Sequence, residues 1–159
     1  MMRTNHIADQ LSAVSTALED ASVDAYGDLS TSAVAALLIM RRSPAISIGT
    51  VAKEVRLSHS ATVRLIDRLE KDWLVRRLRR RGREVMVELT VRGKRKAVEV
   101  AEARRKAAHA LLGDIDESQL DNLSSVLKFI LNDVESSACT RFCYDDPMED
   151  EKVEENEPA

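Results

Sequence analysis

The sequence of 159 residues contains few aromatic residues, prolines, glycines and cysteines. Aromatic side chains make up only 3% of the chain, and its apolar content comes mainly from alanine, valine and leucine. Such a composition is typical of helices packed on helices and argues against a β-sandwich. With three prolines and five glycines, most of the chain can form long uninterrupted helices. The sequence therefore predicts a mainly α fold.

Long apolar runs and a secretory leader are also missing. The longest apolar run, residues 33–40, is far shorter than the roughly 20 helical residues that cross a bilayer. The first residues do not show the charged and apolar regions of a signal peptide. We therefore expect a cytoplasmic protein that has no membrane partner.

Groups of residues that would indicate catalysis are absent from the sequence. It has no glycine-rich phosphate loop, no nucleophile elbow and no pair of histidines at metal-ligand spacing. We therefore expect no enzymatic activity, no metal site and no cofactor. An enzyme that acts on nucleic acid is the weakest alternative, and turnover by the purified protein would revive it.

The two cysteines, Cys139 and Cys143, lie four residues apart near the end of the chain. Arg141 stands between them, and a neighbouring cation can lower the pKa of a thiol. The two cysteines are too few for a zinc site. We therefore consider Cys139 and Cys143 as candidates for a redox pair, while an unreactive pair at a helix end is the simpler interpretation.

The formal net charge of −3 hides a strong segregation of charge along the chain. Residues 41–96 hold 17 Lys or Arg and 6 Asp or Glu, whereas residues 144–159 hold 8 acidic residues and one Lys. A basic centre of this kind is typical of proteins that bind a polyanion. The acidic end lacks the apolar residues of a core, so we expect residues 139–159 to be a disordered tail. The tail either competes with nucleic acid for the basic centre or only improves solubility.

Residues 58–71 have the pattern of an amphipathic helix. One arc at 100° per residue holds Ala61, Thr62, Leu65, Ile66, Leu69 and Trp73. The opposite arc holds Ser60, Arg64, Asp67, Arg68 and Lys71. Ser58 stands at the N-cap position. A shorter amphipathic run, Ile48 to Val55, comes before it, and Arg56 and Leu57 leave room only for a tight turn. This arrangement predicts a helix-turn-helix with its second helix in the recognition position.

A basic hairpin is expected directly after the helix-turn-helix. Residues 74–78 and 85–89 have strand-like patterns, and Gly82 between them supplies the flexible backbone of a hairpin loop. The run from Arg76 to Arg83 contains six arginines in eight residues, a density of like charge that is destabilising unless a polyanion or counterions neutralise it. Residues 45–47 can add a third short strand. A helix-turn-helix followed by such a hairpin is a winged helix.

Long helices are expected on both sides of this winged centre. Residues 4–26, 29–41, 91–112 and 117–134 have helical apolar spacing, and Gly27 and Gly113 end the first and third of these helices. The apolar stripes of the last two helices are too wide to leave in water. We therefore expect residues 1–28 and 91–138 to form a helical dimerisation lobe beside a DNA-binding region at residues 29–90.

The winged centre resembles the MarR family of bacterial transcription regulators. The resemblance is clearest in the segment Leu57 to Glu70 and in Val87-Glu88-Leu89-Thr90-Val91-Arg92-Gly93, which matches the family's L-T-x-x-G step from the wing into the next helix. Arg83 matches the family's wing-tip arginine, which enters the minor groove. The family usually has an aspartate two places before that arginine, where this sequence has Arg81.

Both the residue pattern and the resemblance indicate double-stranded DNA as the partner. Arginine can form paired hydrogen bonds with guanine in the major groove, whereas short polar side chains at a helix start suit phosphate contacts. The expected DNA contacts are Ser58, His59, Ser60, Thr62, Arg64, Arg68, Arg79, Arg80, Arg81 and Arg83. His59 either reads a base or makes no contact with DNA, and an exposed basic helix face by itself is usually only solvated.

The resemblance further implies a homodimeric repressor of a palindromic operator, released by a small ligand or an oxidant. In the family, effectors bind in a cleft between the DNA-binding lobe and the dimerisation helices. The residues expected to line that cleft are Tyr26, Leu37 and Met40, together with the helix after Gly93, although the core is the better interpretation for each of them. The alternative function is a winged-helix protein-interaction module that does not bind specific DNA sequences.

Overall fold

The computed structural model describes residues 1–80 and 82–132, and these form six helices and three short strands. In chain order the elements are α1 (Met2–Tyr26), α2 (Thr31–Met40), β1 (Ile46–Ser47), α3 (Ile48–Val55), α4 (His59–Lys71), β2 (Val75–Arg77), β3 (Met86–Leu89), α5 (Val91–Leu112) and α6 (Glu117–Asn132). The mainly α fold with a small β wing, predicted from the sequence, is confirmed.

Side-chain caps fix where several helices begin. Ser30, Ser47, Ser58 and Thr90 each accept a hydrogen bond from the backbone N–H three residues later, at the starts of α2, α3, α4 and α5. Such a bond satisfies one of the N–H groups that a helix start leaves without a partner. The capping role that the sequence indicates for Ser58 is therefore confirmed.

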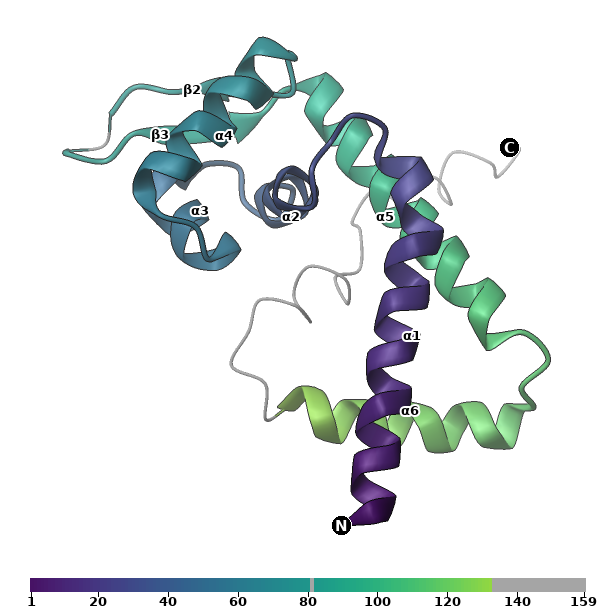
Figure 1. Ribbon diagram of the computed structural model, residues 1–159. Coiled ribbons are helices and arrows are strands. Elements are labelled where there is room, and N and C mark those ends of the chain that lie inside the picture. Colours follow the sequence, from purple (N-terminus) through teal and green to yellow (C-terminus); the bar gives the residue numbers. More distant parts are fainter. Residues whose placement is uncertain (81, 133–159) are drawn as a thin grey trace, which may run out of the picture.

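The strands form one antiparallel sheet in the order β1-β3-β2. Val75 lies opposite Leu89 across the β2–β3 hairpin, and Ile46 lies opposite Val87 on the other side of β3. Val75, Val87 and Leu89 are buried. One face of the sheet therefore belongs to the core, and the hairpin loop extends beyond it as a wing (Figure 1).

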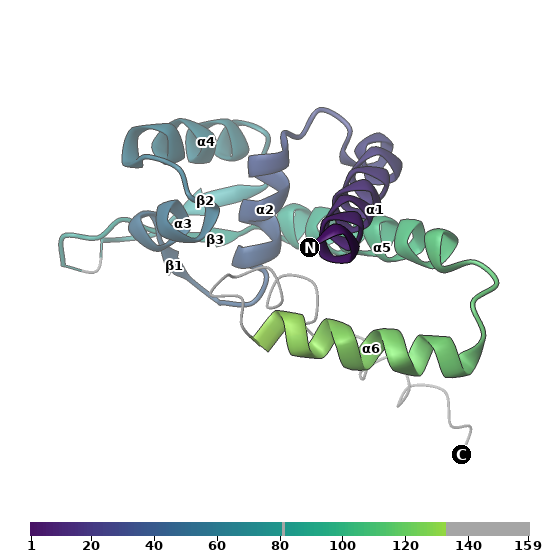
Figure 2. The same ribbon diagram turned by 60° about the horizontal axis from the view of Figure 1, so that its bottom comes forward.

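Helix α2 lies at the centre of the fold (Figure 2). Ala36, Leu37 and Leu38 are completely buried, and Met40 is 1% exposed. Leu37 packs with the core formed by α3, α4 and the sheet, whereas Leu38 packs with Tyr26 of α1 and with α5. The helix therefore joins two clusters, one inside the winged lobe (residues 29–89) and one between that lobe and the long helices.

The ends of α1 and α6 expose apolar side chains. Ile7, Leu11 and Val14 on α1 are more than half exposed, as are Val126 and Phe129 on α6. No residue of α6 is buried. Helices with such stripes usually pack on another surface. Among the described residues no single helix is both long and apolar enough to cross a membrane, and only α1 taken jointly with α2, bent by 82°, meets those criteria.

Trp73 departs from the expectation that it lies on the apolar arc of the recognition helix. Helix α4 ends at Lys71, and Trp73 has a left-handed backbone with φ of 61°. Its side chain is therefore turned away from the helix face and is 75% exposed. The backbone N–H of Trp73 donates to the carbonyl of Glu70, so the residue belongs to the turn that closes the helix.

Candidate nucleic-acid interface

A tight turn joins α3 to α4. Arg56 has a left-handed conformation with φ of 60°, and the N–H of Leu57 donates to the carbonyl of Ala52 over 3.1 Å. Ala52 is buried, and its small side chain allows α3 and α4 to approach closely. The turn and the cap at Ser58 fix the direction in which α4 leaves the lobe, so the helix-turn-helix predicted from the sequence is present.

Helix α4 has a buried face and an exposed face. Thr62, Ile66 and Leu69 are at most 1% exposed, whereas Arg64 and Arg68 are exposed. The two arginines lie four residues apart, which places them on neighbouring turns of the same face. Neither forms an ion pair within residues 1–80 and 82–132. Both guanidinium groups are therefore available to a ligand.

The polar residues at the start of α4 have different roles. Ser58 Oγ accepts from the Ala61 N–H over 3.2 Å and lies 3.4 Å from Ser60 Oγ. Ser58, His59 and Ser60 are exposed. Thr62 is completely buried, and its hydroxyl donates to the Ser58 carbonyl over 2.8 Å. This corrects the expectation that Thr62 contacts DNA, because its side chain faces the core.

The wing presents arginines that form no ion pair among the described residues. Arg79, Arg80 and Arg83 are exposed, and none of them forms an ion pair with any residue that the structure describes. Gly82 at the tip has φ of 65°, a backbone conformation that L side chains rarely adopt. Arg81 lies outside the described residues. The wing is therefore a strongly cationic projection, as its sequence indicates.

Arg77 has a structural role that the sequence did not indicate. Its Nη1 donates to Glu70 Oε1 over 2.8 Å, and its Nη2 donates to Asp67 Oδ1 over 2.5 Å. The hydrogen bond to Asp67 is the main cause that raises the pKa of Arg77 above its ordinary value, and the charge of Glu70 adds to it. Because Asp67 and Glu70 belong to α4, Arg77 ties the wing to the recognition helix. Arg76 pairs similarly with Glu88 across the hairpin.

We expect Arg77→Ala to lower the free energy of unfolding by about 1 kcal/mol, because it removes hydrogen bonds to two carboxylates that remain partly exposed. Urea denaturation measures this change. The matched control is Arg79→Ala, which removes an exposed arginine of the same wing and should change stability by less than about 0.5 kcal/mol. Equal losses in the two variants would mean that the tie to α4 contributes nothing.

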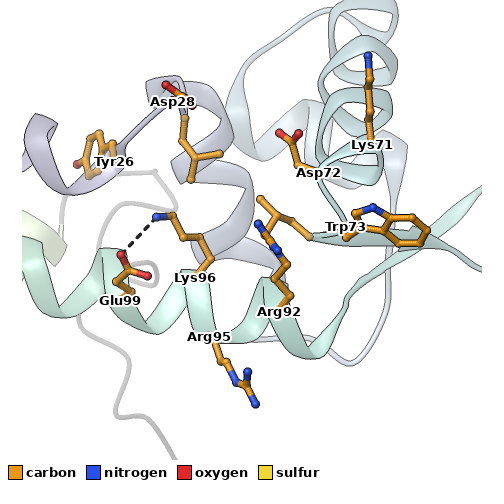
Figure 3. A pocket seen from close by; sticks show the side chains of 11 residues that line it. Tyr26, Asp28, Lys71, Asp72, Trp73, Arg92, Arg95, Lys96 and Glu99 are labelled. Carbon is orange, nitrogen blue, oxygen red and sulfur yellow. Dashed lines mark hydrogen bonds and ion pairs between the residues drawn. The ribbon is translucent and has the colours of Figure 1, made fainter.

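A pocket of about 600 Å³ lies between the winged lobe and the long helices. It is lined by Tyr26, Asp28, Leu29, Lys71, Asp72, Trp73, Leu74, Arg92, Arg95, Lys96 and Glu99 (Figure 3). Of the expected effector residues, Tyr26 lines this pocket. Met40 lines a smaller pocket of about 200 Å³ with Lys94. Leu37 is completely buried in the core and lines neither pocket, in agreement with the core interpretation of this residue.

The junction of the wing with α5 depends on a close approach of two backbones. A Cβ atom added to Gly93 would lie 1.9 Å from the carbonyl oxygen of Leu74. Thr90 reinforces this junction, since its hydroxyl donates to the carbonyl of Trp73 over 2.6 Å and its N–H donates to the carbonyl of Leu74. The threonine and glycine of the L-T-x-x-G step therefore hold α5 against the end of α4.

The two cysteines considered as a redox pair, Cys139 and Cys143, lie outside the described residues.

Comparison with known proteins gives one family and one fold. The MarR family model matches residues 29–82. No curated protein sequence matches the chain. A MarR family protein from Bacillus stearothermophilus has a similar structure, with a TM-score of 0.75, 20% identity and coverage of 82% of this chain and 94% of that one. The YusO protein from Bacillus subtilis has a TM-score of 0.70 and 17% identity, with coverage of 84% of this chain and 97% of that one.

A third similar structure is a complex with a small molecule. NadR in complex with 4-hydroxyphenylacetate has a TM-score of 0.60 and 18% identity, with coverage of 78% of this chain and 91% of that one. At such identities the structural likenesses concern the fold alone. The family match covers the part of the chain from α2 to the wing tip. The winged helix-turn-helix of this chain therefore matches the model of the MarR family, and the described chain shares the fold of solved MarR family structures.

Proposed function

We propose that this protein is a homodimeric transcription regulator that binds a palindromic operator. The observation that carries the proposal is the set of exposed arginines on α4 and the wing that have no acidic partner in the described chain: Arg64, Arg68, Arg79, Arg80 and Arg83. Unpaired like charges crowded on two neighbouring elements repel one another, and a polyanion removes that cost.

The two elements would contact DNA differently. Helix α4 would enter the major groove, where Arg64 and Arg68 can form paired hydrogen bonds with guanine. Ser58, His59 and Ser60 at the helix start would lie near phosphates. Arg79, Arg80, Arg81 and Arg83 would follow the backbone and the neighbouring minor groove. Thr62 is omitted because it is buried.

The second copy of the chain would cover the exposed apolar stripes of α1 and α6. Members of the MarR family are typically dimers, and the stripes that contain Leu11 and Phe129 have no other cover within the described chain. Two recognition helices related by a twofold axis require two half-sites about one DNA turn, or roughly 10 bp, apart. Repression would follow from occupying the operator.

A small effector would release the operator by binding in the pocket that Tyr26 lines, between the winged lobe and the long helices. The NadR complex with 4-hydroxyphenylacetate supports small-molecule binding within this fold. Oxidation of Cys139 and Cys143 is the second route by which the operator could be released. Either event would change the separation of the recognition helices.

Selection of bound duplexes from a random library tests the proposed function. We expect enrichment of a near-palindrome with half-sites roughly 10 bp apart, and mobility shifts that weaken steeply with salt. The alternative, a winged-helix module that binds only proteins, predicts no retention of any duplex at moderate salt.

A further inference from the structure

Arg104 joins α5 to α1 at a point where no side-chain signal in the sequence indicated a contact. Its Nη1 donates to Glu19 Oε2 and to the Tyr26 hydroxyl, both over 2.7 Å. These partners lie 85 and 78 residues away along the chain, and they stand about two turns apart at the end of α1. One guanidinium group therefore bridges two turns of α1.

The surroundings make this contact strong. The Arg104 side chain is 19% exposed, and Tyr26 is buried. Burial lowers the pKa of Arg104, but the hydrogen bonds that it donates to Glu19 and Tyr26 raise the pKa by more, so the net pKa lies above its ordinary value. The second carboxylate oxygen, Glu19 Oε1, is buried and has no hydrogen-bond partner among the described residues. Oε2 is therefore the carboxylate oxygen through which Glu19 pairs with Arg104.

Arg104 lies just beyond the buried part of α5, and Glu19 lies just before the buried part of α1. Gly93, Ala97 and Val100 are the buried residues of α5, and they fix its first half against the winged lobe. Arg104 lies one turn beyond the last of them. On α1 the buried residues are Ser22 and Tyr26, so α1 is held by its final two turns, and Glu19 extends the contact by one turn.

The two helices cross beside the winged lobe (Figure 1) and diverge away from it. The first half of α1 carries the exposed side chains of Ile7, Leu11 and Val14, which the proposed dimer would bury. The first half of α5 carries the winged lobe. The angle between α1 and α5 therefore relates the proposed dimer interface to the recognition helix of the same chain.

We infer that Arg104 is a positioning residue whose pairing with Glu19 and Tyr26 sets this angle, and thereby the half-site spacing that the dimer accepts. The inference rests on the proposed function, because a spacing preference requires a dimer that binds two half-sites. It also explains why a partly buried ion pair stands where an apolar contact would pack as well: hydrogen bonds are directional and so restrict the angle between the helices.

The first test is a series of duplexes in which the selected half-sites are separated by 0 to 5 additional base pairs. We expect the full-length wild-type dimer to prefer the best spacing over a spacing half a turn longer by at least about tenfold, because a rigid dimer loses its second contact. In Arg104→Met the preference should fall to about threefold or less, while affinity for a single half-site stays within about twofold. Glu19→Gln, which keeps the shape of the side chain, should give an intermediate preference.

Arg105→Met is the matched control, because it removes an adjacent arginine of α5 that pairs with Glu102 on its own helix. It should keep the wild-type spacing preference. If Arg104→Met also keeps that preference, or if it loses affinity for every duplex in parallel, the inference is wrong and Arg104 only stabilises the fold.

A second readout does not use DNA, so it separates failure of this inference from failure of the proposed function. Spin labels at Thr16→Cys on α1 and Lys53→Cys on α3, both exposed positions, report the separation of α1 from the winged lobe. Every labelled variant also carries Cys139→Ser and Cys143→Ser, so that only the two introduced cysteines react with the label. Labelled chains are diluted with unlabelled ones, so that the measured distances lie within one chain. We expect Arg104→Met to broaden the distance distribution and Arg105→Met to leave it narrow. An unchanged distribution in Arg104→Met contradicts the inference even if the protein binds no operator.

Discussion

Replacing Arg64 with alanine should weaken binding to the selected operator by about tenfold or more, because a paired arginine–guanine contact contributes roughly 1–3 kcal/mol of discrimination between bases. Binding to random duplex should change much less, since non-specific affinity depends mainly on phosphate contacts. The side chain is exposed on the face of α4 opposite Ile66 and Leu69 and has no ion pair within the described residues. Its removal should therefore leave the fold intact. Mobility-shift titrations on both duplexes measure the two affinities.

Two further variants make this result specific. Arg83→Ala at the wing should lower affinity for all duplexes and reduce the slope of log affinity against log salt by about 1, as expected for one lost phosphate contact. Arg3→Ala removes an exposed arginine in the first turn of α1, a helix whose N-terminal end lies away from the winged lobe (Figure 1), and should change neither quantity. If Arg64→Ala behaves like Arg3→Ala, helix α4 is not the element that reads the operator.

Among the glycines, Gly93 should be the one whose replacement by alanine lowers the stability most. The new Cβ would lie 1.9 Å from the Leu74 carbonyl oxygen and 2.9 Å from the carbonyl carbon, and both are backbone atoms that cannot rotate away. Helix α5 would have to move away from the end of α4, and the hydrogen bonds of Thr90 to Trp73 and Leu74 would be strained. We expect the free energy of unfolding, measured by urea denaturation, to fall by about 3 kcal/mol, which is at the upper end for overpacked sites.

The chain offers a control of opposite sign at Gly49. This glycine lies in α3, and an added Cβ would meet only Ser47 Oγ at 3.9 Å. Alanine favours the helix over glycine, so Gly49→Ala should raise stability by about 0.5–1 kcal/mol. A small loss in Gly93→Ala, similar to the change at an ordinary surface site, would contradict the close approach of α5 to Leu74.

Local patterns in the sequence predicted most of the fold. The apolar spacing of residues 48–55 and 91–112 matches α3 and α5 to the residue, and Ser58 caps α4 as expected. These predictions hold because each depends on interactions within a few neighbouring residues. The strand order and the pairing of β1 with β3 bring together more distant segments, and only the winged-helix pattern indicated them.

The sequence was less informative where a side chain's role depends on the third dimension. Periodicity placed Thr62 on the apolar arc, yet its residue type also suggested a DNA contact, and only its burial separates the two roles. Trp73 was assigned to a helix that ends two residues earlier. The six arginines of residues 76–83 look equivalent in the sequence, but Arg77 is tied to Asp67 and Glu70. The carboxylates seven and ten residues earlier were the only available sign of that tie.

The partner of the exposed apolar stripes on α1 and α6 could be inferred only indirectly. The spacing of Leu11 and Val14 predicts that α1 has an apolar face, and their exposure shows that the described chain does not cover that face. Neither observation defines the angle at which a second copy would pack. For this reason the spacing of the half-sites must be measured, and we infer that Arg104 contributes to it through its hydrogen bonds to Glu19 and Tyr26.

The mass of the complex between the purified protein and its selected operator, determined by sedimentation with a duplex of known length, tests the central proposal most directly. We predict two chains on each duplex, with protection of two half-sites about one DNA turn apart. A complex that contains a single chain, or a protein that remains monomeric and binds no duplex at moderate salt, would contradict the proposal that two winged lobes bind neighbouring turns of DNA.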